Sequence, residues 1–465
     1  MSKSTSSTVS RREFLRGTGR VAAASALAGV AVPHVHAAED HTLRLALIGC
    51  GGRGTGAAAN ALSVNNGPIR LVALGDVFEN RLKGSFASLS KQFPKQVDVP
   101  EDRKFVGFDA YQKAMDCLRP GDIAILATPP AFRWVHFGYA IQKGLNVFME
   151  KPVTVDGPTS RRMLQQAEQA SAKNLKVGVG LMSRHSRALQ ELAHRIRDGQ
   201  LGEIVHMRGY RMHGPIGYFS SLPNPPDISE LLYQVQRFHS FLWASGGCFS
   251  DFYIHIIDHC GWMKGSWPVK AQGTGGRHFR QSPEGATYID QNFDTYSIEY
   301  SFADGTTFIM DGRCMAGCAN RYSSYALGTK GLAIISAHGD CGLPSRIYKG
   351  YNPEPSKLVW ESKVKPGEEN PYQNEWNALI DAIRTNKPYN ELKRGVEASL
   401  VTSLGRMSAH TGQVLTYDEM LNCAHEFAPG LDKLTMNSPA PLKKGPDGRY
   451  PVPQPGLVTK QEYEG

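Results

Sequence analysis

The pattern G-x-G-x-x-G, directly after a short apolar run, constrains the fold of this chain more than any other feature. Residues 43–48 form the run, and Gly49, Gly51 and Gly54 carry the pattern. The run has the length of a buried parallel strand. The glycines permit a tight turn, close approach of a pyrophosphate and packing of the next helix, expected over 55–64. The N–H groups at that helix start suit phosphate oxygens. We therefore expect a dinucleotide-binding unit that also uses Gly52 and Arg53.

An acidic residue at the end of the next expected strand indicates which dinucleotide binds. The strand over 69–74 runs into Gly75-Asp76, and Asp76 lies 22 residues beyond Gly54. A carboxylate there accepts hydrogen bonds from ribose hydroxyls and repels a 2′-phosphate, so NAD is favoured over NADP. Arg81 is close enough in sequence to approach a phosphate, which moderates that preference. The alternative for Asp76 is a solvated acid at a strand end.

The first 37 residues have the pattern of a twin-arginine signal peptide. Arg11 and Arg12 precede Glu13 and Phe14, an Ala-rich apolar stretch follows over 21–32, and small residues end at Ala37. The pattern predicts export in the folded state by the twin-arginine translocase, to the periplasm. That route suits a tightly bound cofactor. Because no later stretch is comparably apolar, we expect no stable membrane anchor after cleavage.

Composition excludes some classes of partner and site. The chain has 465 residues and a net charge of +9, but its basic residues are scattered, so we expect no nucleic-acid partner. None of the eight cysteines forms a CxxC pair, and Cys314 and Cys318 lack the second pair that a zinc site needs. We therefore expect no metal. Disulfides are compatible with the periplasm, but spacing does not pair the cysteines.

Alternation of apolar runs with helical segments predicts an α/β fold with two domains. Residues 38–182 read as a doubly wound parallel sheet, and residues 183–428 as an α+β substrate and oligomerisation domain on an open, mostly antiparallel sheet. Residues 429–465 are rich in Pro, Gly and Lys, which predicts a surface tail with little core of its own. The loops that leave the carboxyl ends of parallel strands face the ligand crevice. The residues at such ends are Thr128, Pro129, Glu150, Lys151 and Pro152.

Four motifs, taken in order, resemble the Gfo/Idh/MocA oxidoreductases over roughly residues 42–425. They are the GCGGRG turn, Ala-Thr-Pro at 127–129, Glu-Lys-Pro at 150–152, and Gly246-Gly247-x-x-x-Asp251-x-x-x-His255-x-x-Asp258. The twin-arginine pattern is similar to the exported members, which include glucose–fructose oxidoreductase and NAD-dependent glycosidases. The resemblance implies a Rossmann domain, a bound nicotinamide cofactor, a carbohydrate substrate and a homo-oligomer. It places Lys151, Asp251 and His255 at the nicotinamide and substrate.

The chemistry of oxidising an alcohol suits those three residue types. A hydroxyl proton must leave while hydride passes to the nicotinamide, and His255 is the expected general base because the ordinary pKa of histidine is about 6.5. Asp251 lies four residues earlier, on the same face of a helix expected over 250–262, and would orient the imidazole or bind a sugar hydroxyl. Lys151 would hydrogen-bond the reacting oxygen. Glu150 would support the strand end, and Pro152 would fix the turn, with a cis peptide as one option.

Further polar residues are candidates for the substrate pocket. They are Arg184, His185, Tyr218 and Asp258, and Arg211 and His213 belong to the same rim over 210–218. Alternatively, the polar residues around His255 form the face of an interface helix, or, with His259, hold a metal.

Three functions remain open from sequence. The first is an NAD-dependent sugar oxidoreductase, and the second is a glycosidase or lyase that oxidises a sugar transiently and regenerates NAD. The third is a non-catalytic sugar-binding protein.

Overall fold

The computed structural model describes residues 41–278 and 281–464, and from Thr42 onward the chain forms one compact unit. The expected signal peptide lies outside the described residues. None of the described helices is both long and apolar enough to cross a membrane.

The first domain is built on a six-stranded parallel sheet with the order β3-β2-β1-β4-β5-β6. Its strands are β1 (Leu43–Ile48), β2 (Ile69–Asp76), β3 (Lys104–Val106), β4 (Ile123–Leu126), β5 (Asn146–Met149) and β6 (Val177–Val179). This order reverses at β1 and β4, the point where doubly wound sheets bind dinucleotides. Strands β4, β5 and β6 are buried throughout, as expected for a sheet covered on both faces. The expected α/β architecture is confirmed.

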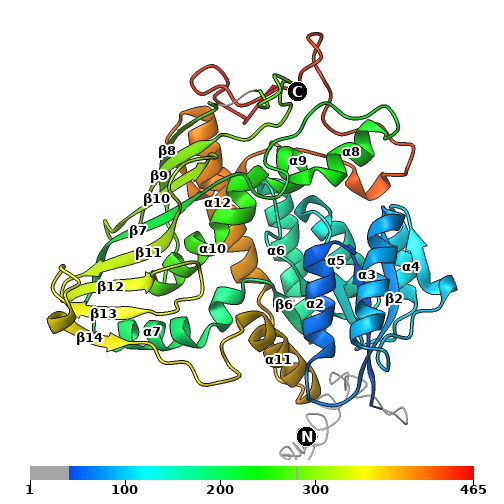
Figure 1. Ribbon diagram of the computed structural model, residues 1–465, viewed down its shortest axis with the longest axis horizontal. Helices are drawn as coiled ribbons and strands as arrows, with labels where there is room; N and C mark the ends of the chain where they lie inside the picture. The colour runs from blue at the N-terminus through cyan, green and yellow to red at the C-terminus, as the bar shows by residue number, and fades with distance from the viewer. Residues whose placement is uncertain (1–40, 279–280, 465) are drawn as a thin grey trace, which may run out of the picture. The chain divides into compact units, whose positions relative to one another are not determined.

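Helices cover both faces of this sheet (Figure 1). They are α2 (Gly52–Leu62), α3 (Glu79–Gln92), α4 (Ala110–Asp116), α5 (Arg133–Gln142) and α6 (Gly157–Ala172). Helix α2 begins directly at the glycine turn, three residues earlier than expected from sequence. Helix α6 begins beyond Asp156, whose side chain accepts from the Thr159 amide at 2.8 Å, so the chain that follows Lys151 is fixed by a capped helix.

The second domain contains a nine-stranded sheet with the order β14-β13-β12-β11-β7-β10-β9-β8-β15. The strands are β7 (Ile204–His213), β8 (Lys270–Gly276), β9 (Thr295–Ser301), β10 (Thr307–Cys314), β11 (Arg321–Gly328), β12 (Gly331–Ser336), β13 (Arg346–Lys349), β14 (Leu358–Glu361) and β15 (Leu415–Thr416). The ladders are antiparallel except that β7 pairs parallel with β10. Burial alternates along β9 and β10, so one face carries the core and the other is open.

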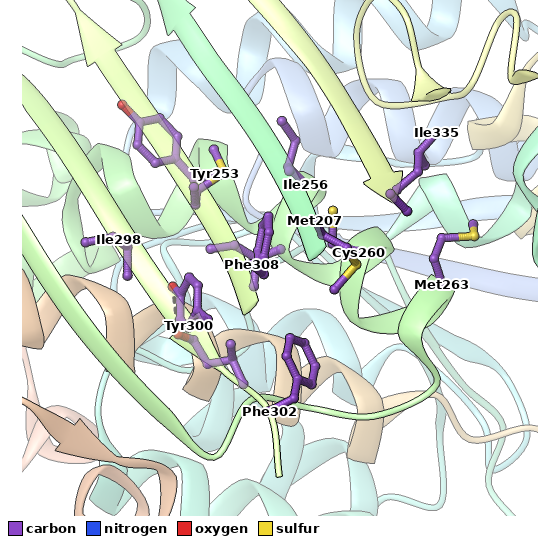
Figure 2. Packing of buried hydrophobic residues seen from close by; sticks show 14 of the residues in the cluster. Met207, Tyr253, Ile256, Cys260, Met263, Ile298, Tyr300, Phe302, Phe308 and Ile335 are labelled. Carbon is purple, nitrogen blue, oxygen red and sulfur yellow. Dashed lines mark hydrogen bonds between the residues drawn. The ribbon is translucent and has the colours of Figure 1, made fainter. Parts of the chain in front are cut away.

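Helix α10 (Gly247–Lys264) lies against the covered face of this sheet. Figure 2 shows Tyr253, Ile256 and Cys260 of α10 packed beside Met207 and Phe308 of the strands. A Cβ on Gly209 of β7 would overlap the Ile256 side chain, so the glycine lets helix and sheet approach closely. The remaining helices are α7 (Arg187–Arg197), α8 (Glu230–Gln236), α9 (Leu242–Ser245), α11 (Pro371–Arg384), α12 (Leu392–Thr411) and α13 (Tyr417–Asn422).

Helix α12 connects the two domains. Gly395 lies against Val179 of β6, and Gly405 lies against Tyr300 of β9, so one helix contacts both sheets. Most of its length is buried, and it packs on α6 and α10. The helix therefore holds the loop after β5 beside α10, which is where the expected catalytic residues lie.

The C-terminal segment 429–465 differs from the surface tail that its composition suggests. Leu442, Tyr450 and Tyr463 are buried in a cluster with Trp243. Glu462 is 1% exposed and forms an ion pair with Arg406 of α12. The prediction that this segment has little core was wrong. Its aromatic side chains are buried in the cluster with Trp243, and its Glu462 is the ion-pair partner of the buried Arg406.

Candidate active site

The glycine turn after β1 has the geometry that close backbone packing requires. Gly49 has a φ of 95°, and an added Cβ would lie 2.6 Å from the Ala127 carbonyl carbon. A Cβ on Gly54 would overlap the Gly49 oxygen. By contrast, nothing lies within 4 Å of a Cβ built on Gly51 or Gly52. The turn is tight on its inner side and leaves an open cradle at the start of α2, which fits a pyrophosphate.

A cavity of about 610 Å³ opens from this turn. Of the expected cofactor residues, those that line it are Gly49, Gly51, Gly52, Arg53, Gly54, Asp76, Thr128 and Pro129. The second domain contributes Tyr218, Val235, Phe238 and His239 to the same wall. The volume lies within the range of sites for small molecules and cofactors.

Asp76 is 8% exposed and holds the turn through its carboxylate. Its Oδ2 accepts from the Cys50 amide at 2.6 Å, and its Oδ1 accepts from the Phe78 amide at 2.9 Å. Burial raises the pKa of Asp76, although both amides act in the opposite direction. Arg81 lines the same cavity and stacks on Phe78, with its Cζ 4.7 Å from the ring centroid. A basic and an acidic group thus lie together at this end of the cavity.

Glu150 and Arg53 join the end of β5 to the glycine turn. Arg53 donates to Oε1 of Glu150 through Nη2 at 2.6 Å and through Nε at 3.1 Å. The Glu150 side chain is 8% exposed, and Arg53 also stacks on Tyr372 of α11. Glu150 therefore joins the end of β5 to the glycine turn through Arg53.

Lys151 and Asp251 are in contact although 100 residues separate them. The Lys151 ammonium donates to the Asp251 backbone oxygen at 2.7 Å and to its Oδ1 at 3.3 Å. His239 contacts the other carboxylate oxygen, with Nε2 3.1 Å from Oδ2. Burial alone would raise the pKa of Asp251, but Lys151 and His239 hold it well below its usual range. The Lys151–Pro152 peptide is cis.

His255 lies one helical turn beyond Asp251 on α10, next to a carboxylate from another loop. Its Nδ1 is 3.7 Å from Oδ2 of Asp340, which follows β12. Tyr322 of β11 donates its hydroxyl to that same Oδ2 at 2.7 Å. Burial first, and Lys151 second, lower the pKa of His255 to about 4. The imidazole is therefore neutral at pH 7.

Two of the expected substrate residues form an ion pair with each other. Arg184 donates to both oxygens of Asp258, with Nη2–Oδ1 at 2.7 Å and Nε–Oδ2 at 2.9 Å. The Asp258 side chain is 0% exposed. The pair joins the end of the first domain to α10, so both charged groups already have a partner.

Of the other expected polar residues, two are histidines that contact buried polar side chains, and one is a tyrosine that lines the cavity. His185 lies 3.1 Å from Oε1 of Glu391 and is buried. His259 lies 2.7 Å from the Ser324 hydroxyl. Tyr218 lines the cavity at the glycine turn. Across residues 41–278 and 281–464, no group of three His, Cys, Asp or Glu side chains is placed to hold a metal.

Sequence reasoning missed His239 and Asp340. His239 lies in the segment Phe238–Ser240, which has no motif, and Asp340 lies in a loop between Gly339 and Gly342. His239 contacts Asp251, 12 residues further along the chain, and Asp340 approaches His255 from a loop much later in the sequence. The only sequence signal for His239 was a polar residue beside aromatic residues, and the only signal for Asp340 was a polar residue in a glycine-rich loop.

Comparisons with known proteins agree with this architecture. Residues 189–334 match the family model of the GFO/IDH/MocA C-terminal domain. The chain is 26% identical over 242 residues to scyllo-inositol 2-dehydrogenase (NAD(+)) of Bacillus subtilis, a match that covers 51% of this chain and 58% of that protein. It is 24% identical over 350 residues to an inositol 2-dehydrogenase of Rhizobium meliloti, covering 74% and 89%.

A solved structure supports the fold. The Lactobacillus casei scyllo-inositol dehydrogenase with bound NAD(H) and scyllo-inositol aligns with a TM-score of 0.57 and 18% identity, over 81% of this chain and 99% of that one. Residues 189–334, which follow the six-stranded sheet in the sequence, are therefore similar to the C-terminal domain of the Gfo/Idh/MocA proteins.

Proposed function

We propose that this protein is an NAD-dependent oxidoreductase of the Gfo/Idh/MocA type that acts on a hydroxyl-bearing carbon of a sugar or sugar derivative. The observation that carries the proposal is the contact between Lys151 and Asp251 beside a cavity lined by the glycine turn. The curated relatives are inositol dehydrogenases, whose names describe oxidation of a cyclic polyol.

The residues around the cavity fit a dinucleotide. The open cradle at Gly51 and Gly52 suits the pyrophosphate, and Asp76 has oxygen lone pairs for the adenosine ribose. When bound, the nicotinamide ring supplies the acceptor for hydride. Asp76 would face a 2′-phosphate with a carboxylate, which supports NAD over NADP.

The polar cluster fits removal of a hydroxyl proton. The Lys151 ammonium has three donors and uses two on Asp251, so the third is free for the reacting oxygen. His255 is neutral, and its Nε2 would take the proton while Nδ1 faces Asp340. The Asp340 carboxylate would then stabilise the imidazolium. Asp251 fixes the ammonium and completes the arrangement.

The test is to purify the protein, measure its bound NAD, and follow absorbance of the reduced cofactor with a panel of sugars and inositols. Accumulation of NADH with substrate supports net oxidation. Product formation by NAD-loaded protein without accumulation identifies a redox-neutral reaction, as in the glycosidase alternative. Binding of a sugar without cofactor or turnover would identify the non-catalytic alternative.

We also propose export by the twin-arginine route, which rests on residues 1–37 alone. A cell fractionation of the full chain beside an Arg11→Lys, Arg12→Lys variant tests it. The wild type should reach the periplasm with NAD bound, and the variant should stay in the cytoplasm.

A further inference from the structure

Arg211 lies on the face of strand β7 against which helix α10 packs. Side chains alternate along a strand, so residues 209, 211 and 213 share one face. Gly209 approaches Ile256 of α10, and the His213 ring lies 6.0 Å from the Phe252 ring. Arg211 therefore points toward the part of α10 between Asp251 and His255, and its charge contributes to lowering the pKa of His255.

Three other cations near the site have carboxylate partners within ion-pair distance. Those pairs are Arg53 with Glu150, Lys151 with Asp251, and Arg184 with Asp258. Arg211 has no ion pair and no hydrogen bond with any residue in the described part of the chain. Its Nε is buried without a partner. A guanidinium has five N–H donors, and leaving a buried donor unsatisfied is unfavourable.

Tyr322 holds this guanidinium in one plane. The Arg211 Cζ lies 3.7 Å from the Tyr322 ring centroid, which leaves the donor edge of the guanidinium free. The Tyr322 hydroxyl is committed to Asp340 at 2.7 Å. Asp340 thus contacts Tyr322 and lies near His255. Among the described residues it forms no ion pair with Arg211.

His213 adds an acceptor next to this donor. Its Nδ1 lies 2.5 Å from the Gly214 carbonyl oxygen, which can only accept, so Nδ1 carries the proton. Its Nε2 is buried and has no partner in the structure. The rim therefore offers a free planar cation and a free acceptor together, which suits an anionic group beside a hydroxyl.

We propose that the substrate is an acidic sugar derivative and that Arg211 binds its anionic group. Planar guanidinium matches a carboxylate, sulfate or phosphate through two parallel hydrogen bonds. The neighbouring His213 accepts from a sugar hydroxyl, and Lys151 and His255 address the carbon that is oxidised. This inference rests on the proposed function, because it assigns the substrate class of the same site.

The test measures binding to NAD-loaded protein by calorimetry in matched sets of sugars. One set is glucose, glucuronate and glucose 6-phosphate, and a second set is the galactose equivalents. At least one acid should bind roughly 10- to 100-fold more tightly than its neutral parent, the range for hydrogen bonds to charged groups. Comparing the carboxylate sugars with the phosphate sugars shows which of the two anionic groups Arg211 binds.

Arg211→Gln should remove this preference, and Arg211→Lys should keep only part of it. Arg321→Gln is the matched control, because Arg321 stacks on Tyr210 with its Cζ 3.5 Å from the ring centroid, on the opposite face of the sheet. Unchanged NAD affinity and melting temperature would show that each variant is folded.

Three outcomes would overturn the inference. The acids and their neutral parents bind equally, the preference for acids survives Arg211→Gln, or no acid binds at all. The NAD titration separates this failure from failure of the proposed function. Protein that binds NAD and oxidises only neutral sugars keeps the function and loses the inference. Protein that does not bind NAD loses both.

Discussion

His239 donates a hydrogen bond to Asp251 and so helps to fix the carboxylate that holds Lys151. The Tyr218 amide donates to Nδ1 of His239 at 3.2 Å, so the ring proton is assigned to Nε2, 3.1 Å from Asp251 Oδ2. His239 also lines the cavity at the glycine turn. One imidazole thus links the wall of this cavity to the Lys151–Asp251 contact.

We expect His239→Ala to lower turnover by roughly 10- to 100-fold, because it removes a hydrogen bond to a charged group. The pKa of Asp251 should rise, since His239 lowers it. His194→Ala is the control, because the His194 side chain is 63% exposed on α7. Wild-type turnover in His239→Ala would show that the hydrogen bond from His239 to Asp251 is not needed to hold Lys151.

Asp76→Ala should weaken NAD binding and reduce discrimination against NADP. The variant removes the expected ribose acceptor, the repelling charge and the acceptor of the Cys50 amide together. Fluorescence titration with NADH and NADPH measures both effects. Asp98→Ala is the control, because its side chain is 62% exposed in the same domain. Equal affinities in wild type and Asp76→Ala would remove Asp76 from the cofactor site.

Local sequence patterns predicted the first domain well. The apolar run of β1 and the glycine turn lie where expected, and α2 begins only three residues early, because close packing around Gly49 and Gly54 admits few alternatives. The second sheet was expected to be mostly antiparallel, and one parallel pair, β7 with β10, is the exception. Alternating burial in β9 and β10 made these strands visible in the sequence.

Long-range contacts could not be read from the sequence. The family resemblance placed Lys151 and Asp251 at one site, but their direct contact was not predicted, because Asp251 was expected to orient the His255 imidazole or to bind a sugar hydroxyl. Asp340 reaches His255 from a loop whose path no periodicity specifies. Arg406 lies within α12, and the sequence of that helix does not indicate that its ion-pair partner is Glu462.

Glu462→Gln should lower the free energy of unfolding by about 3–5 kcal/mol, the range for breaking a buried ion pair. Arg406 is 0% exposed and also donates to the Val155 oxygen at 2.8 Å and to the Ser250 hydroxyl at 2.5 Å. These two contacts are with the loop after Lys151 and the residue before Asp251, so turnover should fall as well. Chemical denaturation and kcat below the melting temperature measure the two effects.

Glu464→Gln is the control for that variant, because Glu464 is exposed two residues away. It should leave both the free energy of unfolding and kcat unchanged. Wild-type stability in Glu462→Gln would contradict the account of the C-terminal segment. Lower stability with unchanged kcat would limit its role to packing.

Stability should fall as pH decreases from about 6.5 to 4. Burial lowers the pKa of His136 to about 3 and that of His255 and His259 to about 4 in the folded protein. Because the unfolded state binds protons first, at about 6.5, these groups contribute full stability above that pH. Melting curves from pH 4 to 8 test this, and a variant with His136→Phe should show a smaller decrease. A flat profile would contradict the buried neutral histidines.

The most direct test of the central claim compares NAD binding and NADH formation in wild type and His255→Ala. The account predicts that both bind NAD equally, and that the variant forms NADH from the preferred substrate roughly 10²–10⁴-fold more slowly, the usual contribution of a general base. A melting temperature close to that of wild type at pH 7 is the control for folding. NAD-free protein that binds no added NAD, or a variant with the wild-type rate, would contradict the account.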